Sequence, residues 1–114
     1  MDVLSISKEY GSPLYVFHDK EFKDNFLHLC SAFKKEYNNY IPGYSYKTNY
    51  TPHICKLVKS LGGYAEVVSD MELYVAQKIG YESSKIIYNG PCKGVMMEEH
   101  ILNGGISNID NEAE

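Results

Sequence analysis

Apolar and polar positions repeat every 20 residues or so through most of the chain. Each repeat joins a short apolar or alternating run, typical of a strand, to a longer stretch with apolar residues every three or four positions, typical of a helix. Strands joined through helices run parallel, so the pattern predicts an α/β fold, either a doubly wound open sheet or a βα barrel. Periodicity alone does not separate the two. The expected strands start 20, 22 and 20 residues apart, at Tyr44, Tyr64, Ile86 and Ile106.

Cap residues mark the ends of the expected helices. Ser69-Asp70-Met71-Glu72 matches a capping box, in which the serine side chain accepts from a free helix amide and Glu72 reaches back. The last helix of the repeat is expected to run through Val95, Ile101 and Leu102 and to end at Gly104-Gly105, and residues 106–109 are expected to form the fourth strand.

A strand and a helix are expected ahead of the repeat. Residues 14–17 are β-branched and aromatic and follow the turn residues Gly11-Ser12-Pro13, which predicts a short strand whose partner is not evident in the chain. We therefore divide the chain into an N-terminal segment and strand (1–18) and a βα unit (19–114). The helix that opens this unit at Asp19 has one apolar face, made by Phe22, Phe26, Leu29, Phe33 and Tyr37.

The last five residues, Asp110-Asn111-Glu112-Ala113-Glu114, resemble the capped first turn of a helix that has no body. Without that helix one face of the fourth strand lacks cover. We expect the chain to be a truncated piece of a longer protein; the alternative is that it swaps or assembles to hide the open edge.

Composition narrows the function classes. The chain has 114 residues, of which 44% are hydrophobic, and a net charge of -4. All 11 basic residues are lysine, so both a basic stripe and the bidentate guanidinium of nucleic-acid readers are missing. No apolar run approaches the roughly 20 residues that span a bilayer, and the acidic start lacks the features of a signal peptide. We expect no nucleic-acid partner, no membrane association and a cytoplasmic location.

The cysteines and histidines do not suggest a metal site. Cys30, Cys55 and Cys92 are an odd number at wide spacing, which fits neither a disulfide framework nor paired metal ligands. The four histidines are scattered without metal spacing. We expect reduced thiols and no metal.

A lysine at a strand end is the main candidate for chemistry. The run Tyr44-Ser45-Tyr46-Lys47-Thr48-Asn49 alternates, which places Tyr44 and Tyr46 on one face and Lys47 on the other. In β/α folds the active site lies at the carboxyl ends of the strands, where Lys47 is expected. Burial between apolar strands favours the neutral amine, which condenses with aldehydes. The alternative is a solvated charge, the usual state of such a lysine.

Two polar residues are expected at the same edge. Glu66 lies on the second strand and Asn89 follows the third, and both approach Lys47 if the strands align in register. Each has a structural alternative, because a glutamate at a strand end is often solvated and an asparagine before glycine often opens a turn.

Four segments are informative only when they are read together and in order. They are Gly11-Ser12-Pro13-Leu14-Tyr15-Val16, Tyr44-Ser45-Tyr46-Lys47-Thr48-Asn49, Leu61-Gly62-Gly63-Tyr64-Ala65-Glu66-Val67-Val68-Ser69 and Lys85-Ile86-Ile87-Tyr88-Asn89-Gly90-Pro91. In that order they resemble the amino-terminal part of the fold-type III pyridoxal-phosphate-dependent amino-acid decarboxylases, which have an alanine-racemase-like barrel, and among these most of all the diaminopimelate decarboxylases. The resemblance runs from about Tyr10 to the end of the chain.

The resemblance implies a partial (β/α)8 barrel of the TIM type, with about four βα units preceded by a strand and a helix. It places Lys47 on the lysine that holds pyridoxal 5'-phosphate as a Schiff base, and Glu66 where the family has an acidic residue, commonly aspartate, near the cofactor. We add Asn89 to the cofactor-binding candidates. After Ser69 the family often has two glycines, where this chain has Asp70-Met71.

The implied reaction exchanges Lys47 for the amine of a small amino-acid substrate, removes the α-carboxylate and reprotonates the α carbon, as in lysine biosynthesis. The full-length family enzyme is expected to be a homodimer. The family's phosphate loop and other cofactor partners lie beyond Glu114, so we expect this chain alone not to decarboxylate. The alternatives are a related decarboxylase acting on ornithine, arginine or carboxynorspermidine, a cofactor-binding or interaction remnant without turnover, and a flavodoxin-like binding domain.

Overall fold

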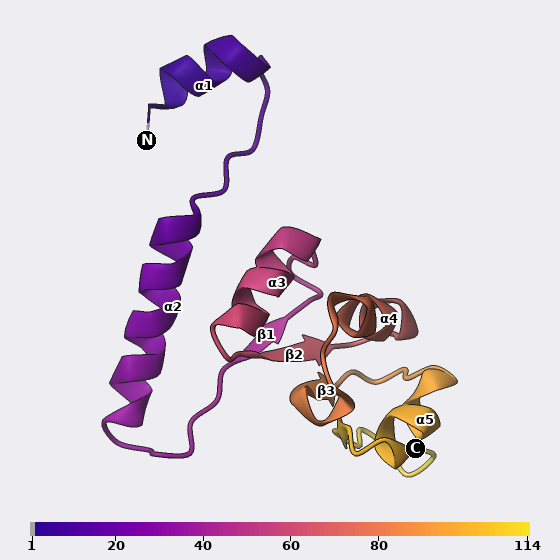
Figure 1. The fold of residues 1–114 in the computed structure, drawn as a ribbon. Helices are drawn as coiled ribbons and strands as arrows, with labels where there is room; N and C mark the ends of the chain where they lie inside the picture. Colours follow the sequence, from indigo (N-terminus) through magenta and orange to yellow (C-terminus); the bar gives the residue numbers. More distant parts are fainter. Residues whose placement is uncertain (1) are drawn as a thin grey trace.

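The computed structural model describes residues 2–114 and contains one parallel four-stranded sheet with connecting helices (Figure 1). The strands are β1 (Gly43–Ser45), β2 (Tyr64–Val67), β3 (Ile86–Tyr88) and β4 (Ile106–Ser107). The helices are α1 (Val3–Tyr10), α2 (Asp19–Lys34), α3 (Pro52–Ser60), α4 (Asp70–Ile79) and α5 (Met96–Leu102), with a 3-10 turn η1 (Ser83–Lys85). Within residues 2–114, no helix has both the length and the hydrophobicity that crossing a membrane requires.

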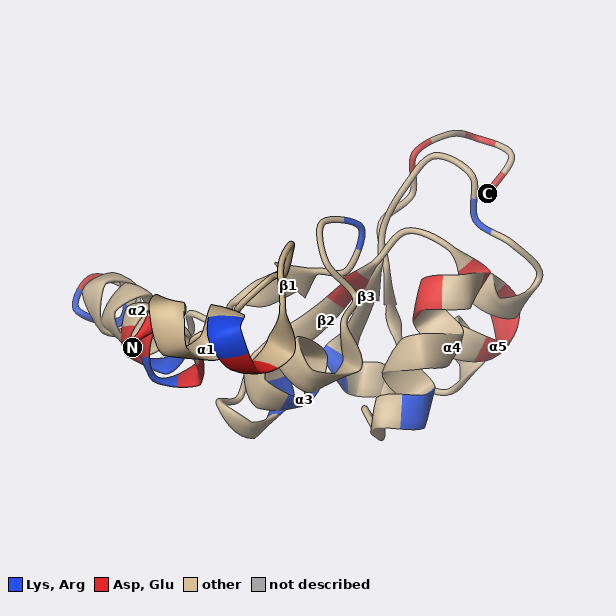
Figure 2. Ribbon diagram, turned by 90° about the horizontal axis from the view of Figure 1, so that it is seen from above, with Lys and Arg blue, Asp and Glu red and all other residues tan. Residues whose placement is uncertain are grey.

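The strand order separates the two architectures that the periodicity left open. A doubly wound sheet reverses its strand order and carries helices on both faces. Here the order is β1-β2-β3-β4, every neighbouring pair is parallel, and α3, α4 and α5 lie on one side of the sheet (Figure 2). This is the arrangement of part of a βα barrel.

The core lies between the sheet and the helices. Side chains alternate along a strand, so every second one faces the helices. The fully buried residues of that face are Tyr46, which directly follows β1, and Ala65, Val67, Ile86 and Tyr88. The register places the other face as a row across the sheet, made by Ser45, Glu66, Ile87 and Ile106. This second face carries the polar residues that concern function.

The capping box that opens α4 is confirmed. The Ser69 hydroxyl accepts from the Glu72 backbone N–H at 3.3 Å. The Glu72 carboxylate is buried and accepts from the Val68 N–H at 2.8 Å, one residue ahead of the cap. Gly80, with φ of 91°, ends the helix in the left-handed conformation that glycine adopts freely. These contacts fix where β2 turns into α4.

The N-terminal strand predicted at residues 14–17 does not form. A strand needs a hydrogen-bonding neighbour, and the sheet does not include this segment, whose Tyr15 is fully exposed. The predicted helix from Asp19 does form, and Phe22 packs edge-on against Tyr44 with ring centroids 6.3 Å apart. It ends at Lys34, so Tyr37 lies outside it.

The helix α1 was not predicted. Its apolar residues Val3, Ile6 and Tyr10 recur at helical spacing, although none of its residues is buried. Asp2 caps it, with its carboxylate accepting from the backbone of Leu4 at 3.1 Å and of Ser5 at 3.3 Å. Gly11, with φ of 87°, follows its end. The spacing and the two cap residues were the available signals.

The last repeat differs from the prediction in detail. Helix α5 buries His100, whereas Val95 is 93% exposed and Leu102 79% exposed. Strand β4 ends at Ser107, not at residue 109. Residues 110–114 form a turn instead of a first helical turn, because the Glu114 carboxylate accepts from the Asp110 N–H at 3.1 Å.

Candidate functional site

Two of the three predicted residues meet at the carboxyl edge of the sheet. Glu66 lies in β2, opposite Ser45 of β1, and Asn89 directly follows β3. The Asn89 Nδ2 donates a hydrogen bond to Glu66 Oε1 at 3.1 Å. The contact follows from the register, because Glu66 pairs with Ile87, two residues before Asn89 on the same face.

A third polar residue, Asn108, extends this contact and was missed in the sequence. Its Nδ2 donates to Asn89 Oδ1 at 3.4 Å, and its backbone N–H donates to the Tyr88 carbonyl at 3.0 Å. Because Ile87 pairs with Ile106, Asn89 and Asn108 stand at matching positions beyond β3 and β4. Ile87 and Ile106 are each followed two residues later by an asparagine, and this repeat in the sequence could have revealed Asn108.

Lys47 lies two residues after β1, in a turn at the same edge. The turn is held by Thr48, whose Oγ1 donates to the Ser45 carbonyl at 2.6 Å. The predicted strand therefore ends earlier than expected. Lys47 is exposed in this chain, so the burial that would favour its neutral amine is not observed here. Among residues 2–114, Lys47 forms no ion pair or side-chain hydrogen bond, so its amine is accessible.

Tyr44 of β1 and Tyr46 of the following turn lie on the other face of the sheet. Their ring centroids are 6.3 Å apart, as the alternation predicted. The Tyr44 hydroxyl donates to the Asn49 carbonyl at 3.1 Å and so ties the strand to the segment that follows Lys47. Tyr46 is fully buried, and burial raises the pKa of its phenol far above the usual range, so it stays protonated. Neither ring faces the Glu66 side of the sheet.

The loop after β3 is fixed by Asp70, one of the residues that stand where glycines are common in the family. Asp70 Oδ1 accepts from the Tyr88 hydroxyl at 2.9 Å, and that hydroxyl accepts from the Gly94 N–H at 3.1 Å. Burial raises the pKa of Tyr88 to about 12. A Cβ at Gly94 would collide with the Asp70 carboxylate. The departure from glycine therefore has a structural role in this chain.

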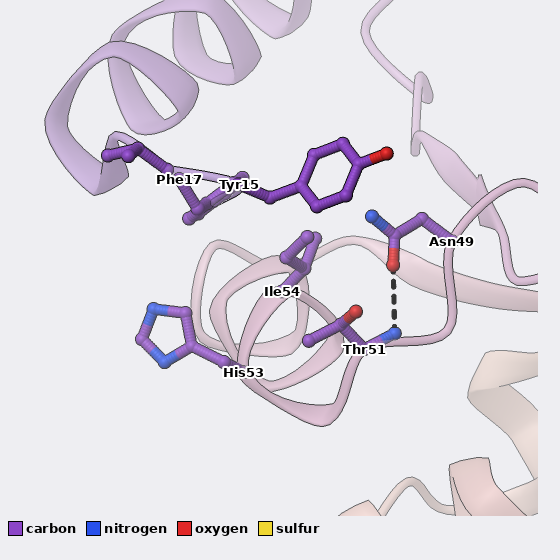
Figure 3. A pocket seen from close by; sticks show the side chains of 7 residues that line it. Tyr15, Phe17, Asn49, Thr51, His53 and Ile54 are labelled. Atoms are coloured by element: carbon purple, nitrogen blue, oxygen red, sulfur yellow. Dashed lines mark hydrogen bonds between the residues drawn. The ribbon is translucent and has the colours of Figure 1, made fainter. Parts of the chain in front are cut away.

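A cavity of about 600 Å³ lies elsewhere, between the 15–17 segment and the start of α3 (Figure 3). Tyr15 and Phe17 line one side, and Ile54 and His53 line the other. His53 is engaged with Asp19, at 2.9 Å. Because this cavity contains none of the three predicted residues, the carboxyl edge of the sheet remains the candidate site.

Comparison with known proteins identifies the family of this chain. Residues 23–114 match the family model described as pyridoxal-dependent decarboxylase, pyridoxal binding domain. The chain belongs to the pyridoxal-dependent decarboxylase family. This confirms the family and the cofactor class that the four sequence segments indicated.

Individual family members agree. The diaminopimelate decarboxylase of Methanocaldococcus jannaschii is 36% identical over 112 residues, which is 95% of this chain and 25% of that protein. The diaminopimelate decarboxylase of Aquifex aeolicus is 35% identical over 88 residues, 77% of this chain and 20% of that protein. The crystal structure of the M. jannaschii enzyme with L-lysine superposes with a TM-score of 0.73 at 30% identity, covering 96% of this chain and 26% of that one.

The chain thus spans about a quarter of the length of these decarboxylases. Its parallel sheet and helices correspond to the amino-terminal part of their βα barrel, as predicted. The residues present are compatible with the family's cofactor. Lys47 offers an exposed primary amine to an aldehyde, and Glu66 keeps Oε2 free of hydrogen bonds from residues 2–114 at the same sheet edge.

Proposed function

We propose that this chain provides the lysine-bearing part of a pyridoxal-phosphate-dependent amino-acid decarboxylase of the diaminopimelate type. The observation that carries the proposal is the shared edge: the free amine of Lys47 follows β1 where Asn89 is hydrogen-bonded to Glu66. An accessible lysine amine at the same sheet edge as a positioned carboxylate supports covalent attachment of an aldehyde cofactor there.

Each residue has a distinct proposed role. Lys47 would hold the cofactor through its Nζ, and this amine would give way to the amine of the substrate. Glu66 accepts a hydrogen bond or a proton at Oε2, while Asn89 occupies Oε1 and so limits the orientations of the carboxylate. When bound, pyridoxal phosphate supplies the electron sink that stabilises the carbanion left by loss of the α-carboxylate.

The substrate class rests on the relatives. Diaminopimelate decarboxylases of two organisms are 35–36% identical to this chain, and one crystal structure of such an enzyme holds L-lysine. We propose a small amino acid as the substrate, with diaminopimelate favoured over ornithine, arginine or carboxynorspermidine. A homodimer of the full-length enzyme and a cytoplasmic location are part of the same proposal, and sedimentation of the purified full-length enzyme tests the first.

The second candidate is a cofactor-binding or interaction remnant without turnover. The observation that favours it is that α3, α4 and α5 all cover the face of the sheet opposite Glu66 (Figure 2). The face that carries Glu66 has none of these three helices over it and could contact a partner. The candidates differ in turnover by the full-length protein, and both are compatible with a 114-residue chain that is inactive alone. We expect the 114-residue chain to release no carbon dioxide from diaminopimelate; release above the buffer control contradicts this expectation.

Attachment is tested by incubating the chain with pyridoxal phosphate, reducing with borohydride and mapping the modified peptide. We expect the label on Lys47. A label spread over all 11 lysines, or absent from Lys47, contradicts the proposal. Lys47→Arg keeps the charge but removes the reactive amine and should abolish the label. Lys56→Arg, at an exposed position of α3, is the matched control and should retain it.

A further inference from the structure

Lys93, which the proposed reaction does not use, is the most enclosed lysine side chain near the candidate edge. It lies in the loop between β3 and α5, and its side chain is 1% exposed. Its Nζ donates to the Gly90 carbonyl at 2.7 Å and to Glu114 Oε2 at 2.6 Å. Asp110 Oδ2 lies 3.6 Å away. A lysine charge enclosed in this way requires such partners, and here it has them.

These partners join two loops at the carboxyl edge. Gly90 and Lys93 belong to the loop that follows β3, whereas Asp110 and Glu114 follow β4. The Glu114 carboxylate also accepts from the Asp110 N–H at 3.1 Å and from Asn111 Nδ2 at 3.2 Å. Lys93 therefore closes a compact polar cluster that fastens one loop to the other, and we call this cluster the Lys93 clamp.

The clamp lies next to the residues that orient Glu66. Gly90, whose carbonyl accepts from Lys93, directly follows Asn89. Asn108, which donates to Asn89 at 3.4 Å, stands two residues before Asp110. Both ends of the Asn89–Asn108 contact are thus attached to segments that the clamp holds.

We propose that Lys93 is a positioning residue that keeps the Asn89 amide directed at Glu66. This inference rests on the proposed function, because it gives Lys93 a role in preparing the cofactor edge. Lys93 itself touches neither Glu66 nor Lys47. It acts by fixing the backbone at Gly90 and, through Glu114, the segment that carries Asn108.

The test compares three variants of the 114-residue chain. Lys93→Met removes the charge with little change in length, and Lys93→Arg keeps the charge and restores donors. Lys85→Met is the matched control, since Lys85 is 52% exposed and pairs only with Glu82 at 3.4 Å. The first readout, measured without cofactor, is the pair of Asn89 side-chain amide signals in a nitrogen–proton correlation spectrum. The second is the pyridoxal-phosphate concentration that half-saturates borohydride trapping on Lys47.

We expect Lys93→Met to shift the Asn89 amide signals towards those of a free side-chain amide and to raise the half-saturating concentration about tenfold. An effect of this size is typical when a residue that orients a metal ligand is removed, and Lys93 has the corresponding position behind Asn89. Lys93→Arg should restore most of both, and Lys85→Met should change neither. A folded Lys93→Met chain with unchanged Asn89 signals overturns the inference, even if overall stability falls. So does a chain in which Lys93→Arg behaves like Lys93→Met.

Two other results of these experiments also decide between the alternatives. If Lys93→Met does not fold, Glu114→Gln takes its place, since it keeps an acceptor while removing the negative charge; displaced Asn89 signals support the inference, and unchanged signals overturn it. If the unaltered chain does not trap the cofactor on Lys47, the proposed function fails, and the Asn89 signals still decide whether Lys93 positions that amide.

Discussion

Asn89 donates a hydrogen bond from its side-chain amide to Glu66 Oε1 at 3.1 Å, joining residues 23 positions apart in the sequence. The contact spans two parallel strands at the edge where β/α proteins hold their ligands. It leaves Asn89 Oδ1 for Asn108 and Glu66 Oε2 for a bound group. A carboxylate with one oxygen engaged in this way has fewer orientations to lose when a ligand binds.

Replacing Asn89 tests the value of that contact. Asn89→Ala removes a hydrogen bond to a charged but partly exposed group, and we expect a loss of about 1 kcal/mol in the free energy of unfolding. Trapping of pyridoxal phosphate on Lys47 should weaken as well. Urea titration and borohydride trapping provide the two measurements. Asn39→Ala, at an exposed position before β1, is the control and should alter neither.

Gly94 is expected to be intolerant of a side chain. Its Cβ would collide with the Asp70 carboxylate, so Gly94→Ala should cost about 1–3 kcal/mol of stability through overpacking. The control is Gly43→Ala, since a Cβ there meets Ile87 at 3.6 Å, an ordinary contact. Equal urea midpoints for the two variants would show that the Asp70 contact does not restrict the loop.

The Tyr88 hydroxyl is expected to stabilise the same loop. Tyr88→Phe leaves the Gly94 N–H without its acceptor and Asp70 without one donor, which should cost about 1–3 kcal/mol. Tyr74→Phe is the control, because Tyr74 is 52% exposed. The comparison is made by urea unfolding, and a loss no greater than that of the control would contradict the expectation.

The Lys93 clamp predicts a pH window. The hydrogen bond from Lys93 lowers the pKa of Glu114 below its usual 4.5. Burial lowers the pKa of Lys93, but the hydrogen bond and charge of Glu114, with Asp110 nearby, outweigh it and hold that pKa above 10.5. The carboxylate therefore contributes stability above pH 4.5 and loses it as the pH falls through the folded pKa, while the lysine contributes below pH 10.5 and loses it as the pH rises through its own.

Carbon-detected titration of Glu114 measures the acid limb. We expect a midpoint below 4.5 in the unaltered chain and a return towards 4.5 in Lys93→Met. Asp110 faces the same amine and is followed in the same spectra. A Glu114 midpoint that does not respond to Lys93→Met is incompatible with the clamp.

The fold was predictable where local signals and the sheet pattern coincide. Ser69 and Glu72 mark the start of α4 through contacts within a few residues, and the four strand runs carry their own alternation. Residues 14–17 carry an equally good strand signal but form none, because a strand depends on a neighbour that no local pattern specifies. Helix α1 shows the reverse, since it forms but was not predicted, although Asp2 and Gly11 mark its ends.

The sequence predicted where the site residues lie better than it predicted their burial and contacts. Parallel register brings Glu66 and Asn89 together, which strand spacing is sufficient to suggest. The exposure of Lys47 depends on what surrounds the turn after β1, which no local pattern specifies. The Lys93 clamp was harder to predict from the sequence, because it joins side chains 21 residues apart and its loop and turn have no periodicity.

Intact-mass analysis of the reduced cofactor adduct tests the central claim most directly. With pyridoxal phosphate equimolar to the chain, followed by borohydride, we predict a single adduct that disappears in Lys47→Arg and persists in Lys56→Arg. An adduct of equal yield in Lys47→Arg would contradict the claim that Lys47 is the lysine to which the cofactor attaches.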